Sequence, residues 1–268
     1  MILDRFRLDN QVAVVTGAGR GLGAAIALAF AEVGADVVIA ARTRSQLDEV
    51  AAQIRDTGRR AHVVTGDLAH PEATAELATA AVAEFGKLDI VVNNVGGSFP
   101  RPLLETSAAM FEKAFHFNVT TALELSKAAI PAMLASDPAG GSIVNISSIC
   151  GTLGTAWMAG YSAAKAGINN FTQWLAVHLA QQYSPRIRVN AVAPGFFITE
   201  QNRALLTDLA TGELTARGQS IIAHTPMGRF GNGEDLLGAV LWLMSPASAF
   251  VTGIVVPVDG GFSAFGGV

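Results

Sequence analysis

The feature of this sequence that most restricts its fold is a regular alternation of short β-branched segments with longer, alanine-rich amphipathic segments. We expect strands at residues 12–15, 37–40, 61–65, 90–93, 142–147, 187–193 and 255–258. We expect helices at residues 21–33, 45–56, 72–85, 108–134, 160–182 and 234–244. Parallel strands need a crossover connection, and the helices supply one between consecutive strands. The pattern therefore predicts an α/β fold of three layers, in which helices cover both faces of a doubly wound, seven-stranded parallel sheet.

The chain is expected to form a single domain over residues 1–268. Its 268 residues fall within the range of single α/β domains, and no linker, internal repeat or low-complexity block divides them. Half of the residues are hydrophobic and only 15% are charged, which favours an aliphatic core of buried strands. The segment 199–225 departs from the alternation, because it is polar and too long for an ordinary connection. We predict that this segment forms a mobile lid over a substrate.

Charge and composition exclude several classes of function. Lys and Arg number 18 against 22 Asp and Glu, for a net charge of −4, and no long basic tract is present, so nucleic acid is not an expected partner. No apolar run reaches the length of a membrane-spanning helix, and Asp4 interrupts the start of the chain with a charge. We therefore expect a soluble, cytoplasmic protein. The single cysteine and the lack of paired His and Cys motifs predict neither a disulfide nor a metal site.

A glycine-rich turn follows the first expected strand and opens the first expected helix. It contains Gly17, Gly19, Gly21 and Gly23, with Arg20 and Leu22 between them. Glycines at such a turn let the backbone approach a pyrophosphate, whose charge then faces the free N–H groups of the helix N-terminus. The turn therefore predicts a dinucleotide site.

Polar or glycine-containing segments also follow three other expected strands. Asp67 and Leu68 follow the third strand, Asn94, Val95 and Gly96 follow the fourth, and Ser148 follows the fifth. The carboxyl ends of parallel strands share one edge of a sheet, and ligands bind there. We expect these residues to line the same site as the glycine-rich turn.

The end of the second strand predicts which dinucleotide is preferred. A carboxylate at this place would bind the ribose hydroxyl of NAD, but the sequence reads Ala40-Ala41-Arg42. Arg42, aided by Arg20, is suited to a 2′-phosphate through charge-assisted hydrogen bonds. We therefore predict NADP(H) as the preferred cofactor, with NAD(H) as the alternative.

Tyr161 and Lys165 form a pair suited to proton transfer. They lie four residues apart in an expected helix and so share one of its faces. A phenol with a pKa near ~10 exchanges protons slowly at neutral pH, and a neighbouring cation lowers that pKa. Ser148, at the end of the fifth strand, can hydrogen-bond the same substrate oxygen.

Together these motifs resemble the short-chain dehydrogenase/reductase family, over essentially the whole chain. The resemblance rests on the glycine-rich turn, Asp67, Asn93-Asn94-Val95-Gly96, Asn118, Ser148, Tyr161 with Lys165, and Pro194-Gly195 followed by Thr199. The family's usual NNAG is NNVG here. The resemblance implies a Rossmann-like fold and an NAD(P)(H)-dependent oxidoreductase that transfers hydride between nicotinamide and a secondary alcohol or ketone. It also implies a homotetramer, with a dimer as the second choice.

The resemblance further implies a role for each matched residue. Tyr161 would be the acid in reduction and the base in oxidation, and Ser148 would polarise the substrate oxygen. Lys165 would bind the nicotinamide ribose and lower the pKa of Tyr161, and Asn118 would hold a water that connects Lys165 to solvent. Four residues would contact the nicotinamide: Pro194, Gly195, Ile198 and Thr199.

The polar segment 199–225 carries the expectation about the substrate. Its residues Gln201, Asn202, Arg203 and Arg217 are suited to hydroxyls and a carboxylate. The segment is similar to the family's sugar-acid members, the D-mannonate oxidoreductases and fructuronate reductases, so a keto-sugar acid is the favoured substrate. The alternatives are a 3-oxoacyl-thioester reductase, a gluconate or polyol dehydrogenase and a hydroxysteroid dehydrogenase. Outside this class, a nucleotide-sensing scaffold and a flavin- or nucleotide-sugar-binding enzyme also remain open.

Overall fold

The computed structural model describes residues 1–136, 139–200 and 202–267, and the strands in these residues form one parallel sheet. They are β1 (Val12–Thr16), β2 (Asp36–Ala41), β3 (Ala61–Thr65), β4 (Ile90–Asn93), β5 (Gly141–Ile146), β6 (Ile187–Pro194) and β7 (Val255–Val258). Their order is β3-β2-β1-β4-β5-β6-β7, and every neighbouring pair is parallel. The order reverses direction between β1 and β4, which creates a crevice at their carboxyl ends. The predicted sheet is confirmed.

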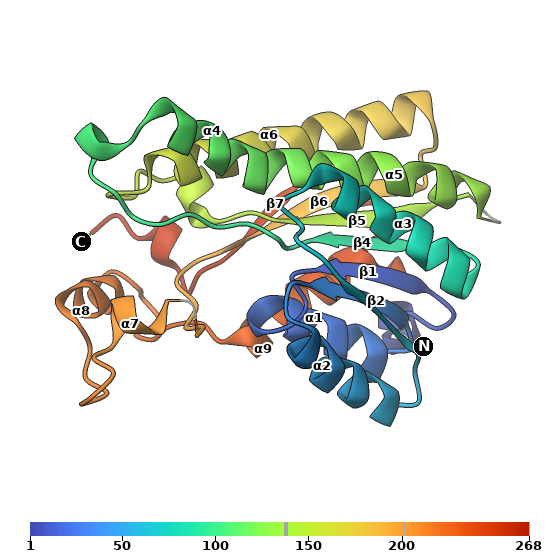
Figure 1. Cartoon of the computed structure of the whole chain (residues 1–268), viewed down its shortest axis with the longest axis horizontal. Helices are drawn as coiled ribbons and strands as arrows, with labels where there is room; N and C mark the ends of the chain where they lie inside the picture. Colours follow the sequence, from blue (N-terminus) through green and yellow to red (C-terminus); the bar gives the residue numbers. More distant parts are fainter. Residues whose placement is uncertain (137–138, 201, 268) are drawn as a thin grey trace.

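Helices cover both faces of this sheet (Figure 1). One face carries α1 (Gly21–Glu32), α2 (Arg44–Asp56) and α9 (Gly233–Met244), and the other carries α3 (Pro71–Phe85), α4 (Ala108–Phe115), α5 (Thr121–Ala135) and α6 (Ala159–Gln182). Each face has its own apolar cluster, one containing Ile26, Leu47 and Leu236 and the other Leu77 and Leu125. The three predicted layers are therefore present. In the part of the chain that the structure describes, no helix is both long and apolar enough to cross a membrane.

The central strands are buried on both faces. Every residue of β1, β4 and β6 is buried, whereas the edge strands β3 and β7 are mostly half-buried. Helices on both faces remove the solvent-facing side of a central strand, so its sequence is largely apolar rather than alternating, with Arg188 and Asn190 of β6 as buried polar exceptions. This is why short β-branched runs were a sufficient sign of the strands.

The helix predicted at 108–134 differs from the observed structure. It consists of α4 and α5, which are joined by a π-helical turn at His116–Thr120. The buried side chain of Asn118 lies in this turn and donates a hydrogen bond to the Ala114 carbonyl at 2.8 Å. A π turn widens a helix by one residue and often marks a functional site.

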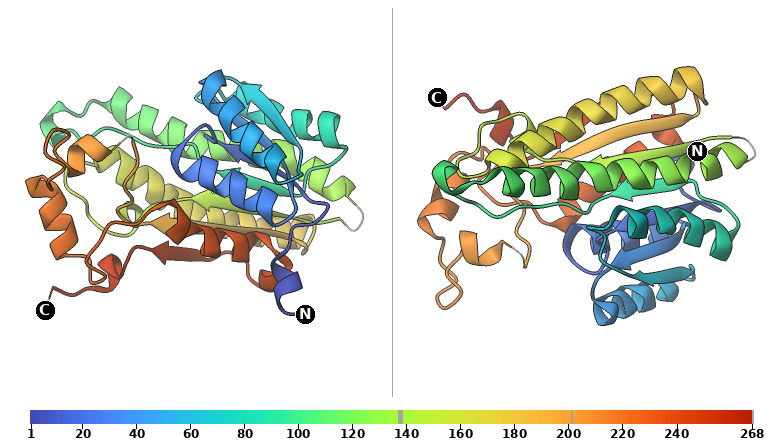
Figure 2. Two further views of the ribbon diagram at one scale, coloured as in Figure 1. Left: turned by 90° about the horizontal axis from the view of Figure 1, so that it is seen from below. Right: turned by 45° about the horizontal axis from the view of Figure 1, so that its top comes forward.

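The segment 199–225 contains two short helices that the sequence did not indicate. They are α7 (Arg203–Leu206) and α8 (Ala216–Ala223), linked by an isolated antiparallel bridge between Thr207 and Leu214. Figure 2 shows the two helices projecting from one end of the molecule, away from the three layers. The mobile lid itself stays a prediction.

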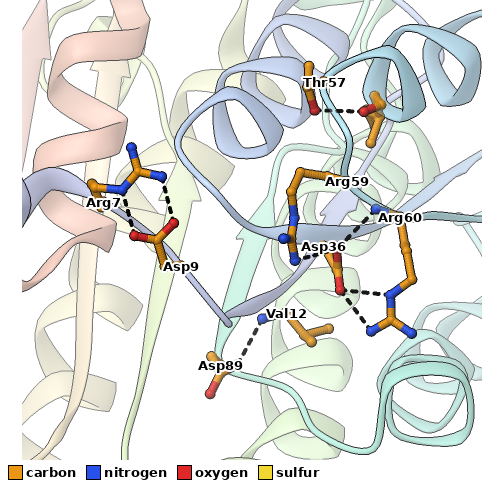
Figure 3. A network of polar contacts seen from close by, with 9 residues as sticks. Arg7, Asp9, Val12, Asp36, Thr57, Arg59, Arg60 and Asp89 are labelled. Atoms are coloured by element: carbon orange, nitrogen blue, oxygen red, sulfur yellow. Dashed lines mark hydrogen bonds and ion pairs between the residues drawn. The ribbon is translucent and has the colours of Figure 1, made fainter.

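Ion pairs stabilise the opposite end of the sheet, where the strands begin (Figure 3). Asp36 is the first residue of β2, and its carboxylate accepts hydrogen bonds from the backbone and guanidinium of Arg60 and pairs with Arg59 at 2.7 Å. Asp89, just before β4, accepts a hydrogen bond from the Val12 backbone at 2.8 Å. These contacts hold the amino ends of β1, β2 and β4 and leave the carboxyl ends free for a ligand.

Candidate active site

The carboxyl ends of the strands open into a cavity of about 800 Å³. The residues predicted for the site that line it are Gly17, Gly19, Arg20, Gly21, Leu22, Gly23, Arg42, Asp67, Leu68, Asn94, Val95, Gly96, Ser148, Tyr161, Lys165, Pro194, Gly195, Thr199, Asn202 and Arg217. Asn118, Ile198 and Arg203 are not among the lining residues. Gln201 lies outside the described residues. The cavity thus joins residues from the ends of β1 to β6 with residues of α6, α7 and α8.

The glycine-rich turn is closely packed in a way that only glycine permits. Gly17 has a φ of +66°, and a Cβ there would lie 2.9 Å from the side-chain nitrogen of Asn94. A Cβ on Gly23 would lie 2.4 Å from the Gly17 carbonyl oxygen. Asn94 holds the turn by donating to the Thr16 carbonyl at 2.8 Å. The turn leads into the N-terminus of α1, which carries no side-chain cap, so its N–H groups are available to a phosphate.

Two arginines lie where the ribose of a dinucleotide is expected. Arg42 follows β2, is exposed and lines the cavity together with Gln46. Arg20 lies in the glycine-rich turn, with Nη1 3.4 Å from a carboxylate oxygen of Glu200. Both side chains of this pair are more than half exposed, so water screens it and its contribution to stability is small.

Ser148, Tyr161 and Lys165 reach the cavity from the end of β5 and the start of α6. A tight turn at Ile149–Gly151 follows Ser148 and packs directly on α6. A Cβ on Gly151 would lie 2.8 Å from the Lys165 carbonyl oxygen. Glycine at this position therefore lets the turn that follows Ser148 approach α6, the helix of Tyr161 and Lys165, closely.

Burial controls the proton affinities of Tyr161 and Lys165. It raises the pKa of Tyr161 to about 12, an effect that Cys150 reinforces and a hydrogen bond with Ser148 opposes. Burial also lowers the pKa of Lys165 to about 8. Lys165 Nζ lies 5.5 Å from the centre of the Tyr161 ring and donates to the Ile146 carbonyl at 2.8 Å. Lys165 stays a predicted influence on the pKa of Tyr161; the net shift in this structure is upward, because loss of hydration outweighs the opposing hydrogen bond with Ser148.

Asn118 supports the site from behind its wall. Its side chain exchanges two hydrogen bonds of 3.0 Å with the backbone of Gly97. A Cβ on Gly96 would lie 2.6 Å from Asn118 Oδ1 and 3.0 Å from Lys165 Nζ. Asn118, Gly96 and Lys165 therefore form one closely packed group, in which Gly96 and Lys165 line the cavity and Asn118 lies behind them.

The loop after β6 is held by its own hydrogen bonds. The Ile198 N–H donates to the Gly231 carbonyl at 3.0 Å. Asn202 Oδ1 accepts from the Thr199 N–H at 2.9 Å, and Asn202 Nδ2 donates to the Phe197 carbonyl at 2.7 Å. The amide of Asn202, predicted for substrate hydroxyls, is thus used by the loop itself. Arg203 begins α7 with an exposed side chain, whereas Arg217 on α8 is half-buried.

Comparison with known proteins decides the family. Residues 17–263 match the family described as Enoyl-(Acyl carrier protein) reductase. An oxidoreductase of Mycobacterium tuberculosis, itself uncharacterized, is 54% identical over 263 residues, which are 98% of this chain and 96% of that protein. The chain belongs to the short-chain dehydrogenase/reductase family.

Solved structures of short-chain dehydrogenases/reductases have the same fold. One, from Haemophilus influenza with bound NAD and provisionally assigned as a D-mannonate oxidoreductase, is 35% identical, with a TM-score of 0.89 and 100% of both chains covered. Another, from Beutenbergia cavernae with NADP at low occupancy and provisionally assigned as a gluconate 5-dehydrogenase, is 36% identical, with a TM-score of 0.87 and 97% and 100% covered. The protein is accordingly an oxidoreductase that acts on CH–OH groups and uses a nicotinamide dinucleotide.

Several lining residues of this short-chain dehydrogenase/reductase were missed in the sequence. Cys150, Thr155 and Met158 line the cavity, and the Thr155 hydroxyl donates to Cys150 Sγ at 3.2 Å. We had no motif for them, yet all three lie between Ser148 and Tyr161, which was a usable signal. The others are mostly apolar, among them Phe99, Phe196 just after β6, and Leu205 and Leu206 of α7. No three His, Cys, Asp or Glu side chains of residues 1–136, 139–200 and 202–267 are grouped as metal ligands.

Proposed function

We propose that this enzyme transfers hydride between NADP(H) and a secondary alcohol or ketone, with Tyr161 as the acid and base. The observation that carries the proposal is that one cavity holds both the glycine-rich turn and the group Ser148, Tyr161 and Lys165. A dinucleotide in the turn and a carbonyl beside Tyr161 would share that cavity. Proximity of this kind removes most of the entropic barrier to hydride transfer.

The chain's own residues supply the proton and the orientation. Ser148 donates a hydrogen bond to the substrate carbonyl oxygen, and Tyr161 gives that oxygen its phenolic proton. Burial keeps the phenol protonated at neutral pH, the form required of an acid in reduction. Asn118 holds the Gly97 backbone beside Lys165, which supports its proposed part in a water-mediated proton path. When bound, the nicotinamide supplies or accepts the hydride.

The residues of the cavity fit a dinucleotide. Gly17, Gly19, Gly21, Leu22 and Gly23 would face the pyrophosphate, whose approach requires the space that side chains would fill. Asp67, Leu68, Asn94, Val95 and Gly96 would face the adenosine, and Lys165, Pro194, Gly195, Ile198 and Thr199 the nicotinamide ribose and ring. These assignments are supported by the lining of one continuous cavity, except that Ile198 lies outside the lining.

NADP(H) is the cofactor that we propose, with NAD(H) as the alternative. Arg42 and Arg20 both line the cavity, and no carboxylate occupies the end of β2 at Ala41. A guanidinium paired with a 2′-phosphate is favoured over one left facing a hydroxyl. The ratio of kcat/KM for NADPH and NADH measures this preference, and Arg42→Ala should lower it by about 10-fold or more. A wild-type preference for NADH would exclude the assignment.

For the substrate we propose a keto acid, with keto-sugar acids of the fructuronate and mannonate type as the first class. Support comes from the polar segment 199–225, from Arg217 in the cavity and from two similar structures provisionally assigned to sugar-acid oxidation or reduction. The apolar lining residues Phe99, Leu205 and Leu206 keep a hydroxysteroid or an acyl thioester as alternatives.

For the assembly we propose a homotetramer, with a dimer as the alternative, in the cytoplasm. Support for an oligomer comes from apolar side chains on the outer surface of α6, where Trp174 is 54% exposed and Val177 is 57% exposed. Exposed apolar residues grouped on one helix are typical of a surface that a partner covers.

Replacing Tyr161 by Phe tests the proposed reaction. The variant keeps the ring and loses the phenolic proton, so we expect a fall in kcat of about 100-fold or more, with the affinity for NADPH unchanged. The chain offers a matched control in Tyr183, its second tyrosine, which is 56% exposed. Tyr183→Phe should retain full activity. Turnover by Tyr161→Phe close to that of the wild type would refute the mechanism.

A further inference from the structure

Four polar side chains of the segment 199–225 were expected to contact the substrate, and the structure separates Arg217 from the rest. Asn202 is consumed by hydrogen bonds within its own loop. Arg203 does not line the cavity, and Gln201 lies outside the described residues. Arg217 lines the cavity, is half-buried and has no hydrogen bond or ion pair with any residue in 1–136, 139–200 and 202–267.

Arg217 is carried by a well-fixed element. The Thr215 hydroxyl caps α8 by accepting from the Gly218 N–H at 3.1 Å and donates to the Leu205 carbonyl at 2.9 Å. Gly218, the neighbour of Arg217, packs so tightly on α7 that a Cβ would lie 2.2 Å from the Leu206 carbonyl oxygen. The two helices therefore form one unit that presents Arg217 to the cavity.

Among the described residues, no carboxylate lies within ion-pair distance of Arg217. The carboxylates that line the cavity are Asp67, beyond β3 in the predicted adenosine region, and Glu200, which faces Arg20 at 3.4 Å. The lining residues of α7 are the apolar Ala204, Leu205 and Leu206. A guanidinium beside apolar groups is less screened by water than one on an open surface, and a carboxylate is its best planar partner.

We infer that Arg217 is the specificity-determining residue of this enzyme and that it binds the carboxylate of the substrate. The inference rests on the proposed function and deepens it, because it assigns the preference for acids to one side chain. Tyr161 on α6 holds the reacting carbonyl and Arg217 on α8 holds the acid group. The substrate therefore bridges the catalytic helix and the α7 and α8 unit.

The experiment compares a keto acid with its own methyl ester, using D-fructuronate and levulinate as two independent pairs. The wild type should reduce each acid with a kcat/KM about 10- to 100-fold above that of its ester, the range of one charge-assisted hydrogen-bonded pair. Arg217→Met should remove this preference by slowing the acids and not the esters. Arg217→Lys should recover part of it, because an ammonium keeps the charge without the planar fork.

Arg203→Met is the matched control, since Arg203 is an exposed arginine of the same segment that does not line the cavity. It should keep the wild-type preference for acids. NADPH affinity and melting temperature, measured for every variant, show whether the fold is retained. Equal rates for acid and ester in the wild type, or a preference for acids that survives in Arg217→Met, would overturn the inference. Failure of the wild type to reduce any ketone would count against the proposed function instead.

Discussion

Lys165 is the residue whose protonation should control activity near physiological pH. Burial lowers its pKa to about 8, while the pKa of Tyr161 is raised to about 12. Below pH 8 the lysine is an ammonium and the tyrosine a phenol, as carbonyl reduction requires; above it Lys165 becomes neutral long before Tyr161 ionises. We therefore predict that kcat/KM for ketone reduction falls as the pH rises through about 8. A pH profile measures this, and a rate that stays constant up to the pKa of Tyr161 would contradict it.

Gly96 has no side chain, and this leaves the space in which Asn118 and Lys165 lie. A Cβ at this position would lie 2.6 Å from Asn118 Oδ1 and 3.0 Å from Lys165 Nζ. Gly96→Ala should displace one of these groups and lower kcat by about 100-fold, since small displacements of catalytic groups have large effects. Gly238→Ala is the control, because Gly238 lies inside α9 with open space around its Cα. It should keep full activity and gain about 0.5–1 kcal/mol of stability. Similar activity of the two variants would contradict the role of Gly96.

Sequence reasoning at the residue scale succeeded where a motif places several groups together. Tyr161 and Lys165 lie one turn apart on a helix, so their proximity could be predicted from spacing alone. The fate of Asn202 could not, because its amide can bond either a substrate or the adjacent loop, and the loop geometry decides between them. The upward pKa shift of Tyr161 was also missed, since burial depends on segments far away in the chain.

At the scale of elements, the π turn at His116–Thr120 was hidden from sequence analysis. Its residues have the apolar spacing of an ordinary helix, so one continuous helix was the natural prediction. The turn contains Asn118, whose side chain bonds the backbone of Gly97, 21 residues away. A contact between residues so far apart cannot be detected in the sequence around Asn118. The helices α7 and α8 were missed for a different reason, because both are short; the N-cap Thr215, which accepts from the Gly218 N–H three residues later, was a local signal for α8.

The start of β2 is an element boundary that depends on a buried charge. Asp36 has a side chain only 7% exposed and bonds both Arg59 and Arg60. Asp36→Ala should lower the free energy of unfolding by about 1–3 kcal/mol, because it removes the carboxylate that accepts charge-assisted hydrogen bonds from Arg60 and pairs with Arg59. Urea unfolding measures this. Asp9→Ala removes a pair with Arg7 that is half exposed and screened by water, so this variant should unfold at close to the wild-type urea concentration. Equal costs for the two variants would contradict the role assigned to Asp36.

The contribution of Asp36 should also depend on pH. Burial alone would raise its pKa, but hydrogen bonds from Arg60 and the charges of Arg59 and Arg60 outweigh burial and lower the pKa from 3.8. A lowered pKa in the folded state means that the stabilisation is complete above the unfolded-state pKa and is lost as the pH falls through the folded-state value. The difference in stability between wild type and Asp36→Ala should therefore shrink only in acid, below about pH 4.

For the whole molecule, the alternation of strands and helices was enough to predict the parallel sheet and its layers. Right-handed crossovers and short connections leave few arrangements of seven strands, which is why the doubly wound order followed from the sequence. The position of the segment 199–225 beside the cavity could be predicted from the sequence only in part. That it belongs after β6 was evident, but which of its side chains face inward depends on how α7 and α8 pack.

The outer surface of α6 gives a prediction about assembly. Trp174 and Val177 are both more than half exposed on it, and Trp174 stacks on His178 with ring centres 4.8 Å apart. If a second copy covers this surface, light scattering should give the mass of four chains of 27.8 kDa each, and Trp174→Glu should reduce it to that of dimers or monomers. A wild-type monomer at micromolar concentration would contradict the proposed assembly.

The central claim is that hydride reaches a carbonyl carbon, whereas the description of the matching family names an enoyl reductase, which acts on a carbon–carbon double bond. An α,β-unsaturated keto acid offers both bonds to the same enzyme. We would incubate it with NADPH that carries deuterium as the transferable hydride and locate the label in the product by NMR. The account predicts an unsaturated alcohol with one deuterium on the carbinol carbon, formed by the wild type and not by Tyr161→Phe. A saturated ketone with deuterium on the β-carbon would contradict it.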